Sequence, residues 1–350
     1  MARKRGAASN PAPRFAAHAF EPDPDAAGHG EATEPGTRFV TDASRSIISR
    51  NTSPDIPFDA SLNPYRGCEH GCSYCYARPS HEYLGLSAGL DFERVIFVKE
   101  NAAALLEAEL RRPSWKPQLL QLSGITDPYQ PVERRSRVTR ACLEVLLQFR
   151  NPVGVITKNH LVTRDTDLLA RLAEQQLTYV SVSLTTLEEP LRRVMEPRTA
   201  TAERRLAAMR QLSGAGVPVH ASIAPVIPGL NDHELPALLE AAAEAGAQSA
   251  SYTVLRLPGA VERIFTDWLE EEFPDRRDKV LGRIREMRGG KLNNSGFGQR
   301  MRGHGTYAEQ LRGLFRLGLR RAGLSADRPV PELRTDLFRI PGSSEQPRLF

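Results

Sequence analysis

Residues 61–78 read SLNPYRGCEHGCSYCYAR, and this stretch holds three of the four cysteines in the 350-residue chain. Cys68, Cys72 and Cys75 follow a short run near Ala60–Tyr65 that we expect to be a first strand. Cysteines this few and this bunched do not make a disulfide framework, but they are typical of metal or redox sites in intracellular proteins. The stretch therefore predicts a metal or redox site in a loop after a strand, in a cytoplasmic protein.

Three chemistries fit the spacing Cys68-x3-Cys72-x2-Cys75. Three thiolates holding an iron–sulfur cluster would leave one iron open to a substrate or cofactor. A zinc ion would need a fourth ligand, which His70 or His81 could supply, and the chain would then be a non-catalytic scaffold or binding protein. A redox dithiol made of Cys72 and Cys75 is the third reading, and it gives Cys68 no role. The spacing alone leaves all three chemistries open.

The overall composition is that of an ordinary globular protein, because 40% of the residues are apolar and 25% are charged. No run of about eighteen apolar residues is present, so we expect no membrane span. The basic N-terminus has no apolar segment behind it and does not resemble a secretory signal. A formal net charge of +5 permits an anionic partner without requiring one.

Short apolar runs alternate with amphipathic segments along the middle of the chain. The apolar runs predict strands at Gln118–Ser123, Val153–Thr157, Thr178–Leu184, Val217–Ala224 and Gln248–Leu255. The amphipathic segments predict helices at Ala102–Arg112, Val138–Phe149, Thr166–Gln175, Thr201–Ala215 and His233–Ala245, with further helices near 260–272, 277–288 and 305–322. This alternation predicts βα units around a parallel sheet, and six strands fit when the first strand is included.

Composition divides the chain into four parts. Residues 1–45 are rich in Pro, Ala, Gly and Asp, and they predict a disordered tail because they cannot bury enough apolar surface to offset their ordering entropy. Residues 46–260 contain the alternating strands and helices of the core. Residues 261–325 predict a helical extension, and the Pro-rich residues 326–350 predict a loosely ordered tail.

The cysteine spacing and the residue before Cys75 resemble the radical S-adenosylmethionine (SAM) superfamily, whose hallmark is CxxxCxφC with an aromatic φ. Tyr74 occupies the aromatic position in this chain. The resemblance implies that Cys68, Cys72 and Cys75 hold a 4Fe–4S cluster whose open iron binds SAM. It also implies an α/β fold, a partial TIM-type (β/α)6 barrel with a helical extension, and an enzyme whose 5′-deoxyadenosyl radical abstracts hydrogen from a substrate.

The same resemblance assigns contacts to SAM at the ends of the predicted strands, where an α/β barrel gathers its site. The implied cofactor-binding residues are Tyr74, Gly124, Thr126, Lys158, Ser183, Ile227 and Gly229. Two motifs depart from the family pattern. The stretch Ser123–Asp127 reads SGITD where GGE is common, and the fifth-strand motif GxIxGxxE begins with Pro225 and ends with Asp232.

Within the superfamily, the sequence resembles the spore photoproduct lyase-like group, often labelled DNA repair photolyases. The resemblance rests on SLNPYRGCEHGCSYCYAR, TDPYQPVE, ITKNHLVTRDTDLL and PVIPGLND. The lyase returns a hydrogen atom from an extra cysteine after the second strand, where this chain has Gly124 and Ile125, so repair of a thymine dimer is not implied. The substrate stays open between a small molecule and a nucleic acid, and the implied electron donor is a flavodoxin or ferredoxin.

Two residues outside the cofactor set are candidates for the catalytic site. Tyr129 follows the second predicted strand and faces either the site or the barrel rim, whereas Arg256 follows the last strand and could bind an anionic group. Cys142 lies on the apolar face of a predicted helix, so we expect a core residue there. The many basic residues of 283–321 fit nucleic acid or a solvated helix face. The glycine-rich loop 289–305 is expected to cover the mouth of the barrel.

Overall fold

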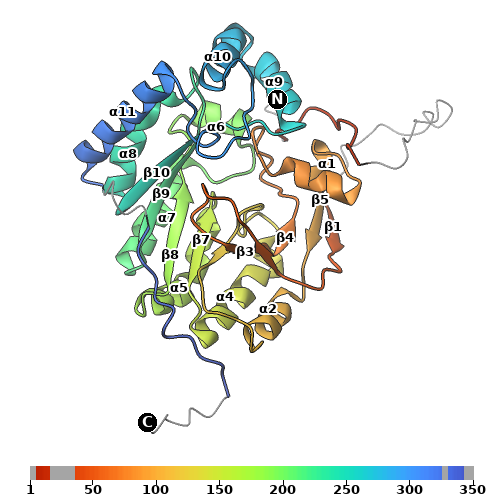
Figure 1. The fold of residues 1–350 in the computed structure, drawn as a ribbon, viewed down its shortest axis with the longest axis vertical. Helices are drawn as coiled ribbons and strands as arrows, with labels where there is room; N and C mark the ends of the chain where they lie inside the picture. Colours follow the sequence, from red (N-terminus) through yellow and green to blue (C-terminus); the bar gives the residue numbers. More distant parts are fainter. Residues whose placement is uncertain (1–4, 16–35, 325–329, 343–350) are drawn as a thin grey trace, which may run out of the picture.

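A seven-stranded sheet forms the centre of the molecule (Figure 1). The computed structural model describes residues 5–15, 36–324 and 330–342. The strands lie in the order β10-β9-β8-β7-β6-β3-β2, and every neighbouring pair except β2–β3 is parallel. Their bounds are β2 Ile48–Arg50, β3 Ala60–Leu62, β6 Leu120–Leu122, β7 Val153–Thr157, β8 Thr178–Ser183, β9 Val219–Val226 and β10 Ser249–Val254. Six parallel strands confirm the predicted partial (β/α)6 barrel, and β2 adds an antiparallel edge.

Helices connect successive parallel strands and cover the outside of the sheet (Figure 1). The longer ones are α2 Ala102–Leu110, α4 Val138–Phe149, α5 Thr166–Ala173, α7 Ala202–Gly214 and α8 Leu235–Glu244. Shorter helical segments are η2 Arg78–Leu84, α3 Glu133–Ser136, η3 His160–Asp165, α6 Glu189–Met195 and η4 Asp232–Glu234. In α4 the predicted apolar face is buried, because Cys142, Leu146 and Phe149 are all fully covered.

The inner face of the sheet is polar, whereas the outer face is apolar. In β8, Val180 and Val182 belong to the main hydrophobic core under the helices. Because side chains alternate along a strand, Tyr179 lies on the inner face, where its hydroxyl donates to Oε1 of Gln121 at 2.8 Å. Gly154 lies between these two side chains, and a Cβ there would come within 2.7 Å of both the Gln121 Oε1 and the Tyr179 hydroxyl. Only glycine leaves room for this contact.

A second, three-stranded sheet lies beside the barrel. It contains β1 Arg38–Thr41, β5 Val95–Val98 and β4 Tyr65–Arg66 in the order β1-β5-β4, and α1 Leu90–Arg94 leads into β5. The β1–β5 pair is parallel and the β4–β5 pair is antiparallel. The sequence did not predict this sheet, because strands this short do not show a recognisable period.

Part of residues 1–45, predicted to be a disordered tail, is packed against the fold. Residues 5–15 lie beside the cysteine loop, and Glu93 accepts hydrogen bonds from the backbone N–H groups of Gly6 at 3.1 Å and Ala7 at 2.9 Å. The stretch also contains β1. The prediction was wrong for these segments because it counted apolar side chains, whereas their backbone groups hold them in place. The rest of the stretch lies outside the described residues.

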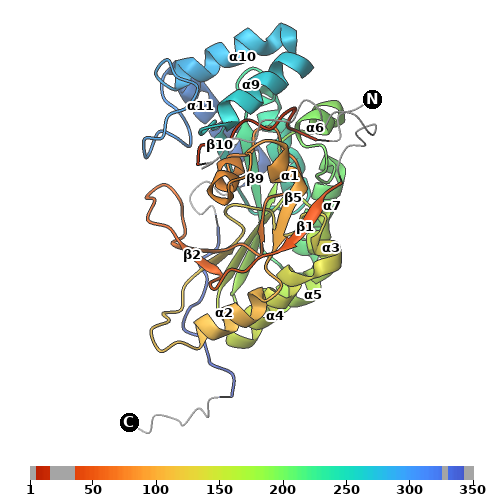
Figure 2. The same cartoon turned by 90° about the vertical axis from the view of Figure 1, so that its right-hand side faces the viewer.

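The helices after β10 pack on the barrel at two places. They are α9 Val261–Glu272, α10 Pro274–Met287 and α11 Thr306–Ala322, and all three occupy segments predicted to be helical. α11 lies along α8, and its Phe315 ring is centred 4.6 Å from the ring of Tyr252 in β10. α9 and α10 lie at one end of the molecule (Figure 2), where Val280 shares an apolar cluster with Cys72. No helix of the described chain combines the length and the apolar character that a membrane span requires.

The segment between α10 and α11 joins the two edges of the sheet. The Met301 carbonyl accepts a hydrogen bond from the Val254 N–H at 2.8 Å, at the end of β10. The Arg300 guanidinium pairs with Asp55, with 2.7 Å from Nε to Oδ2, and also contacts the Ser53 hydroxyl. Asp55 and Ser53 belong to the loop between β2 and β3, at the other edge of the sheet. The segment therefore bridges the gap that an incomplete barrel leaves open.

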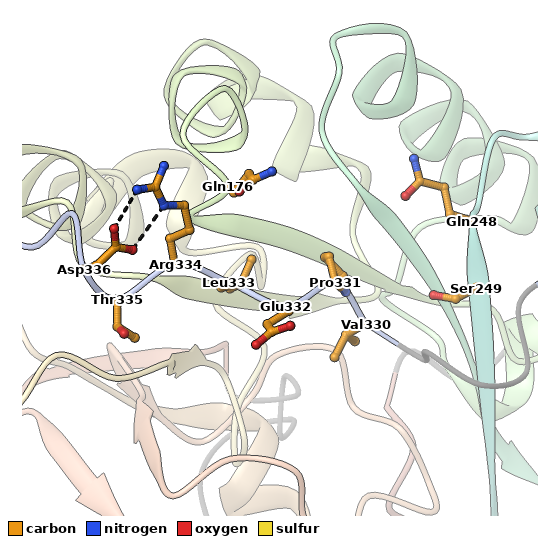
Figure 3. Close-up of a pocket in the computed structure, with 10 residues that line it drawn as sticks. All are labelled: Gln176, Gln248, Ser249, Val330, Pro331, Glu332, Leu333, Arg334, Thr335 and Asp336. Carbon is orange, nitrogen blue, oxygen red and sulfur yellow. Dashed lines mark hydrogen bonds and ion pairs between the residues drawn. The ribbon is translucent and has the colours of Figure 1, made fainter.

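Residues 330–342 run past the amino-terminal ends of the strands. The Arg334 N–H donates to the Gln176 carbonyl at 3.0 Å, just before β8 begins. This segment forms one wall of a cavity of about 720 Å³, and Gln248, just before β10, lies on another wall (Figure 3). Within the stretch 326–350, predicted to be a loosely ordered tail, these residues are held by backbone hydrogen bonds from Arg334 and Arg339.

Candidate active site at the carboxyl ends of the strands

The cysteine loop follows β4 and is held through its backbone. The Cys68 N–H donates to the Phe92 carbonyl at 2.9 Å. The Gln130 side chain then contacts the loop on both sides of this cysteine. Its Nε2 donates to the Gly67 carbonyl at 3.1 Å, and its Oε1 accepts from the Glu69 N–H at 2.9 Å. These contacts fix where the first cysteine leaves the strand.

A buried arginine holds the second part of the loop. Arg78 is fully buried and donates from Nε and Nη2 to the Cys72 carbonyl at 3.0 Å and 2.7 Å. Its Nη2 also lies 2.5 Å from Oε1 of Glu93. Because Glu93 also binds the backbone of Gly6 and Ala7, the N-terminal segment and the cysteine loop share one anchoring ion pair.

Gly67 is the most crowded position of the loop. Its φ is +79°, and a Cβ would lie 2.8 Å from the Val95 carbonyl oxygen and 3.0 Å from the Phe92 carbonyl oxygen. We expect Gly67→Ala to lower the free energy of unfolding by more than about 2 kcal/mol, because backbone on two sides cannot give way. Gly85→Ala is the matched control, since its φ is +70° in open space, and it should cost about 1 kcal/mol. Urea unfolding measures both, and equal costs would contradict this account.

The three thiols share one buried environment. Burial raises the pKa of Cys68, Cys72 and Cys75, and at Cys68 the nearby Asp127 and the other two thiols raise it further. Thiols of this kind stay neutral unless a positive centre offsets the charge of their thiolates. The loop is therefore suited to a metal centre whose binding releases the thiol protons.

The spacing of the sulfurs does not suit a single metal ion. Sulfur ligands about 2.3 Å from a tetrahedral zinc lie about 3.8 Å from one another. Within the described residues, only Glu188, His233 and Glu234 bring three ligand atoms within 4.8 Å of one another. The three cysteine sulfurs therefore do not all lie within 4.8 Å of one another, so they do not form a compact group around one zinc ion.

The two histidines that could complete a zinc site have other contacts. Nε2 of His81 lies 2.9 Å from the Val95 carbonyl. His70 is buried, with Nδ1 3.4 Å from Asp127 and Nε2 3.4 Å from the Asn159 side chain. Neither histidine joins the cysteines in a group of three close ligands. The structure therefore gives no support to the Cys3His alternative.

A cluster of buried charges lies beside Cys72. Glu196 accepts a hydrogen bond from the Tyr74 hydroxyl and pairs with Arg205, and Nζ of Lys158 lies 3.3 Å from its Oε1. Burial alone would raise the pKa of Glu196, but Arg205, Lys158 and the Tyr74 hydroxyl hold it well below its usual range. Two cations thus face one carboxylate next to the thiols, and this excess of positive charge suits an anionic group.

Asp127 ties the ends of β6 and β7 to the cysteine loop. Its carboxylate accepts hydrogen bonds from the Thr157 hydroxyl and the Lys158 N–H, each at 2.7 Å. Burial would raise the pKa of Asp127, but the neighbouring His70 and these hydrogen bonds lower it. The carboxylate therefore stays ionised at neutral pH and holds His70 at the loop.

Four of the predicted cofactor residues lie around the charge cluster or the apolar surface beside it. The Lys158 ammonium is 5.7 Å from the centre of the Tyr74 ring. Ser183 ends β8, and its carbonyl accepts from Arg205 at 3.0 Å. Ile227 follows β9 and belongs to the apolar cluster that contains Cys72 and Tyr74. The ends of β7, β8 and β9 therefore meet at the cysteine loop.

The other three predicted cofactor residues make backbone contacts or face away from the charge cluster. Gly124 has a φ of +108°, and its carbonyl accepts from the Tyr76 hydroxyl at 2.6 Å. The Thr126 hydroxyl donates to the Tyr65 carbonyl at 3.0 Å and so fastens β6 to β4. Gly229 has a φ of +80° and faces α10, where a Cβ would lie 3.7 Å from the nearest side chains. The structure thus places Gly229 on the outer side of its turn.

The two weaker catalytic candidates have different surroundings. Tyr129 is fully buried, and its hydroxyl donates to Asp165 at 3.1 Å, so it belongs to an internal network. Arg256 is partly exposed, and its guanidinium lies over the ring of Tyr76 at 5.6 Å from the ring centre. Tyr76 comes directly after Cys75 and is half exposed. Arg256 therefore lies near the cysteines, whereas the hydroxyl of Tyr129 contacts Asp165 instead.

Four residues that shape the site were not singled out from the sequence: Arg78, Asp127, Gln130 and Arg205. Arg78 ends the quoted cysteine stretch, and Asp127 and Gln130 lie in TDPYQPVE, so these two stretches were the available signal. Arg205 gave no such signal, because it lies within α7 among charged residues that look solvent-facing.

The comparison with protein families agrees with this geometry. The model of the radical SAM superfamily matches residues 62–242, more than half of the chain. The chain belongs to the radical SAM superfamily. It is therefore a radical SAM enzyme, and the cofactors of its family are a 4Fe–4S cluster and SAM.

Relatives of this radical SAM enzyme occur in bacteria and archaea. An uncharacterized protein of Mycobacterium tuberculosis is 39% identical over 234 residues, which cover 66% of this chain and 68% of the relative. An uncharacterized protein of Methanocaldococcus jannaschii is 29% identical over 173 residues, covering 49% and 62%.

Solved structures of similar fold include spore photoproduct lyase. A cysteine-to-serine mutant of that lyase matches with a TM-score of 0.60 at 18% identity, over 81% of this chain and 79% of the lyase. The lyase complexed with dinucleoside spore photoproduct matches with a TM-score of 0.59 at 17% identity over the same shares. At these identities the likeness concerns the fold.

Proposed function

We propose that Cys68, Cys72 and Cys75 hold the 4Fe–4S cluster, and that the chain cleaves SAM reductively to abstract hydrogen from an organic substrate. The observation that carries this proposal is that three cysteines of one loop, whose sulfurs do not form a compact zinc-sized group, lie beside an excess of positive charge. When bound, the reduced cluster supplies the electron that breaks the sulfonium bond and yields a 5′-deoxyadenosyl radical. A flavodoxin or a ferredoxin would reduce it.

The residues around the loop would bind and orient SAM. Lys158 is partly exposed beside Tyr74, where its ammonium can pair with the carboxylate of SAM. Ile227 offers the adenine an apolar surface at the end of β9. Ser222 and Thr253 alternate with core residues of β9 and β10 and are partly exposed, so their hydroxyls would line the space for ribose or substrate.

The fate of the radical would differ from that in spore photoproduct lyase. Solved structures of that lyase include a complex with dinucleoside spore photoproduct. This chain has Gly124 and Ile125 after β6, and its fourth cysteine, Cys142, is fully buried in α4. We therefore propose hydrogen-atom abstraction from a small molecule or a nucleic acid, and we do not extend dimer repair to this chain.

Reductive cleavage of SAM tests the proposal. Reconstituted full-length protein, reduced without oxygen, is expected to form 5′-deoxyadenosine and methionine in equal amounts. Lys158→Met should raise the SAM concentration for half-maximal rate at least about tenfold, because a charge-assisted hydrogen bond is lost. Lys116→Met, at an exposed position, is the matched control. A protein that carries a reduced 4Fe–4S cluster and still forms no 5′-deoxyadenosine would refute the proposed reaction.

A further inference from the structure

A second hollow lies between α10, α11 and the turn that follows β9. Its volume is about 700 Å³, within the range of pockets that bind small molecules. Residues of all three elements line it, among them Gly229, Asp232, Arg276, Lys279, Arg283 and Tyr307. The hollow contains no cysteine, so it is separate from the site described above.

Three cationic side chains of α10 face this hollow. Arg276, Lys279 and Arg283 are three and four residues apart, so they lie on one face of the helix. Among the described residues, none of the three has a carboxylate within ion-pair distance, whereas their neighbour Arg277 pairs with Glu270 at 3.5 Å. Three unpaired cations that converge on one concave surface repel one another, and a bound anion would remove that repulsion.

The opposite wall of the hollow is aromatic and apolar. The Tyr307 ring lies 4.2 Å from the Arg283 guanidinium, and its hydroxyl donates to Asp232. These two contacts hold the Tyr307 ring and the Arg283 guanidinium in place. The Asp232 carboxylate is engaged by its hydrogen bond from Tyr307. Leu230 and Leu311 complete the floor. The hollow thus combines three cations with an aromatic ring and apolar side chains, which suits a ligand that carries both a phosphate and an apolar group.

α10 connects this hollow with the candidate active site. Beside these cations on the same helix, the buried Val280 and Ile284 belong to the apolar cluster that contains Cys72 and Tyr74. The turn after β9 also connects the hollow with the candidate active site, because Ile227 packs in that cluster while Gly229 lines the hollow. A ligand in the hollow would therefore touch two elements that also support the cysteine loop.

We infer that this hollow binds a phosphate-bearing ligand of nucleotide size. Its phosphates would lie on Arg276, Lys279 and Arg283, because guanidinium and ammonium groups form strong charge-assisted hydrogen bonds with phosphate. Its base or sugar would lie against the apolar side chains Leu230 and Leu311. The site goes beyond the proposed cleavage of SAM and does not depend on it. The phosphate can belong to a free nucleotide or to a strand of nucleic acid, and the experiment separates the two sources.

Titration of the reconstituted full-length protein with ATP and with a short oligothymidylate tests the inference. Replacing Arg276, Lys279 and Arg283 together by alanine should weaken binding at least about a hundredfold, because three charge-assisted contacts are lost. Arg285→Ala is the matched control, since this exposed arginine lies on the opposite side of the same helix. We expect it to keep affinity within about twofold of the wild type.

The two ligands identify the source of the phosphate. Loss of ATP binding in the triple variant assigns the site to a free nucleotide. Loss of oligothymidylate binding in the triple variant assigns the site to a nucleic-acid strand. In that case the affinity of the wild type should fall with salt, with a slope of log affinity against log salt of about −1.4 to −2.1 for two or three phosphate contacts.

Three results would overturn the inference. They are equal affinities of the wild type and the triple variant for both ligands, no binding of either ligand at millimolar concentration, and an equal loss in Arg285→Ala. Iron content and SAM cleavage should stay at wild-type levels in the triple variant, because none of its positions contacts the cysteine loop. A failure of this inference is therefore distinct from a failure of the proposed function.

Discussion

Each of the variants Cys68→Ser, Cys72→Ser and Cys75→Ser is expected to purify without an iron–sulfur cluster, even after anaerobic reconstitution. The three sulfurs are the proposed protein ligands, and a serine hydroxyl is a poor substitute for a soft thiolate. Iron and sulfide content should fall to background, and the visible absorption of the cluster should disappear. SAM cleavage should be lost with it, because no electron can reach the sulfonium bond.

Cys142→Ser is the matched control for these variants. Cys142 is fully buried on α4 in the main hydrophobic core, so its hydroxyl analogue should cost about 1–3 kcal/mol of stability but keep the cluster. Circular dichroism confirms that each variant is folded. Loss of iron from a folded Cys142→Ser, or full iron in any variant of the other three cysteines, would refute the ligand assignment.

Glu196→Gln is expected to lower the free energy of unfolding of the apoprotein by about 3–5 kcal/mol, because it leaves the buried Arg205 and the partly buried Lys158 without their counter-charge. The side chain keeps its size, so packing changes little. Glu107→Gln is the control: Glu107 forms an exposed pair with Arg111, and such pairs contribute about 0.3–0.5 kcal/mol. Urea unfolding at neutral pH measures both variants. A cost below about 1 kcal/mol for Glu196→Gln would show that the charge cluster is not balanced by this carboxylate.

The pH dependence of the stability difference between wild type and Glu196→Gln follows from the direction of the pKa shift of Glu196. Because Arg205 and Lys158 hold the pKa of Glu196 in the folded protein below its usual range, the carboxylate stabilises the fold fully above the pKa of the unfolded chain, about 4.3. That stabilisation is lost as the pH falls through the lower, folded pKa. The gap in stability between wild type and Glu196→Gln should therefore narrow as the pH falls below about 4.3.

The strands and helices of the parallel core could be predicted because each depends on a local pattern of apolar residues. β7 and α4 have the predicted bounds, since a buried strand is a continuous apolar run and a surface helix shows an apolar stripe. The three cysteines stood out by spacing alone, whereas only the fold shows that their sulfurs do not all lie within 4.8 Å of one another.

The parts that the sequence did not reveal depend on contacts between distant residues. The backbone of Gly6 and Ala7 is fixed by Glu93, and no composition of residues 1–45 contains that information. Arg205 reaches Glu196 from within an ordinary-looking helix. Gly229 matched a family motif, but its turn presents it to α10, a helix that follows much later in the chain.

The anchoring of the N-terminal segment decides where a purification tag belongs. Arg5 donates to the Glu93 carbonyl at 2.9 Å, and Ala7 is 2% exposed in a cluster with Ala88 and Ile264. A tag or fusion partner at this end of the chain would therefore be joined close to the residues that anchor the cysteine loop. The described chain leaves the molecule at the opposite end (Figure 1), where the Pro341 carbonyl accepts a hydrogen bond from Arg111. Affinity handles for anaerobic preparations should be attached at that end.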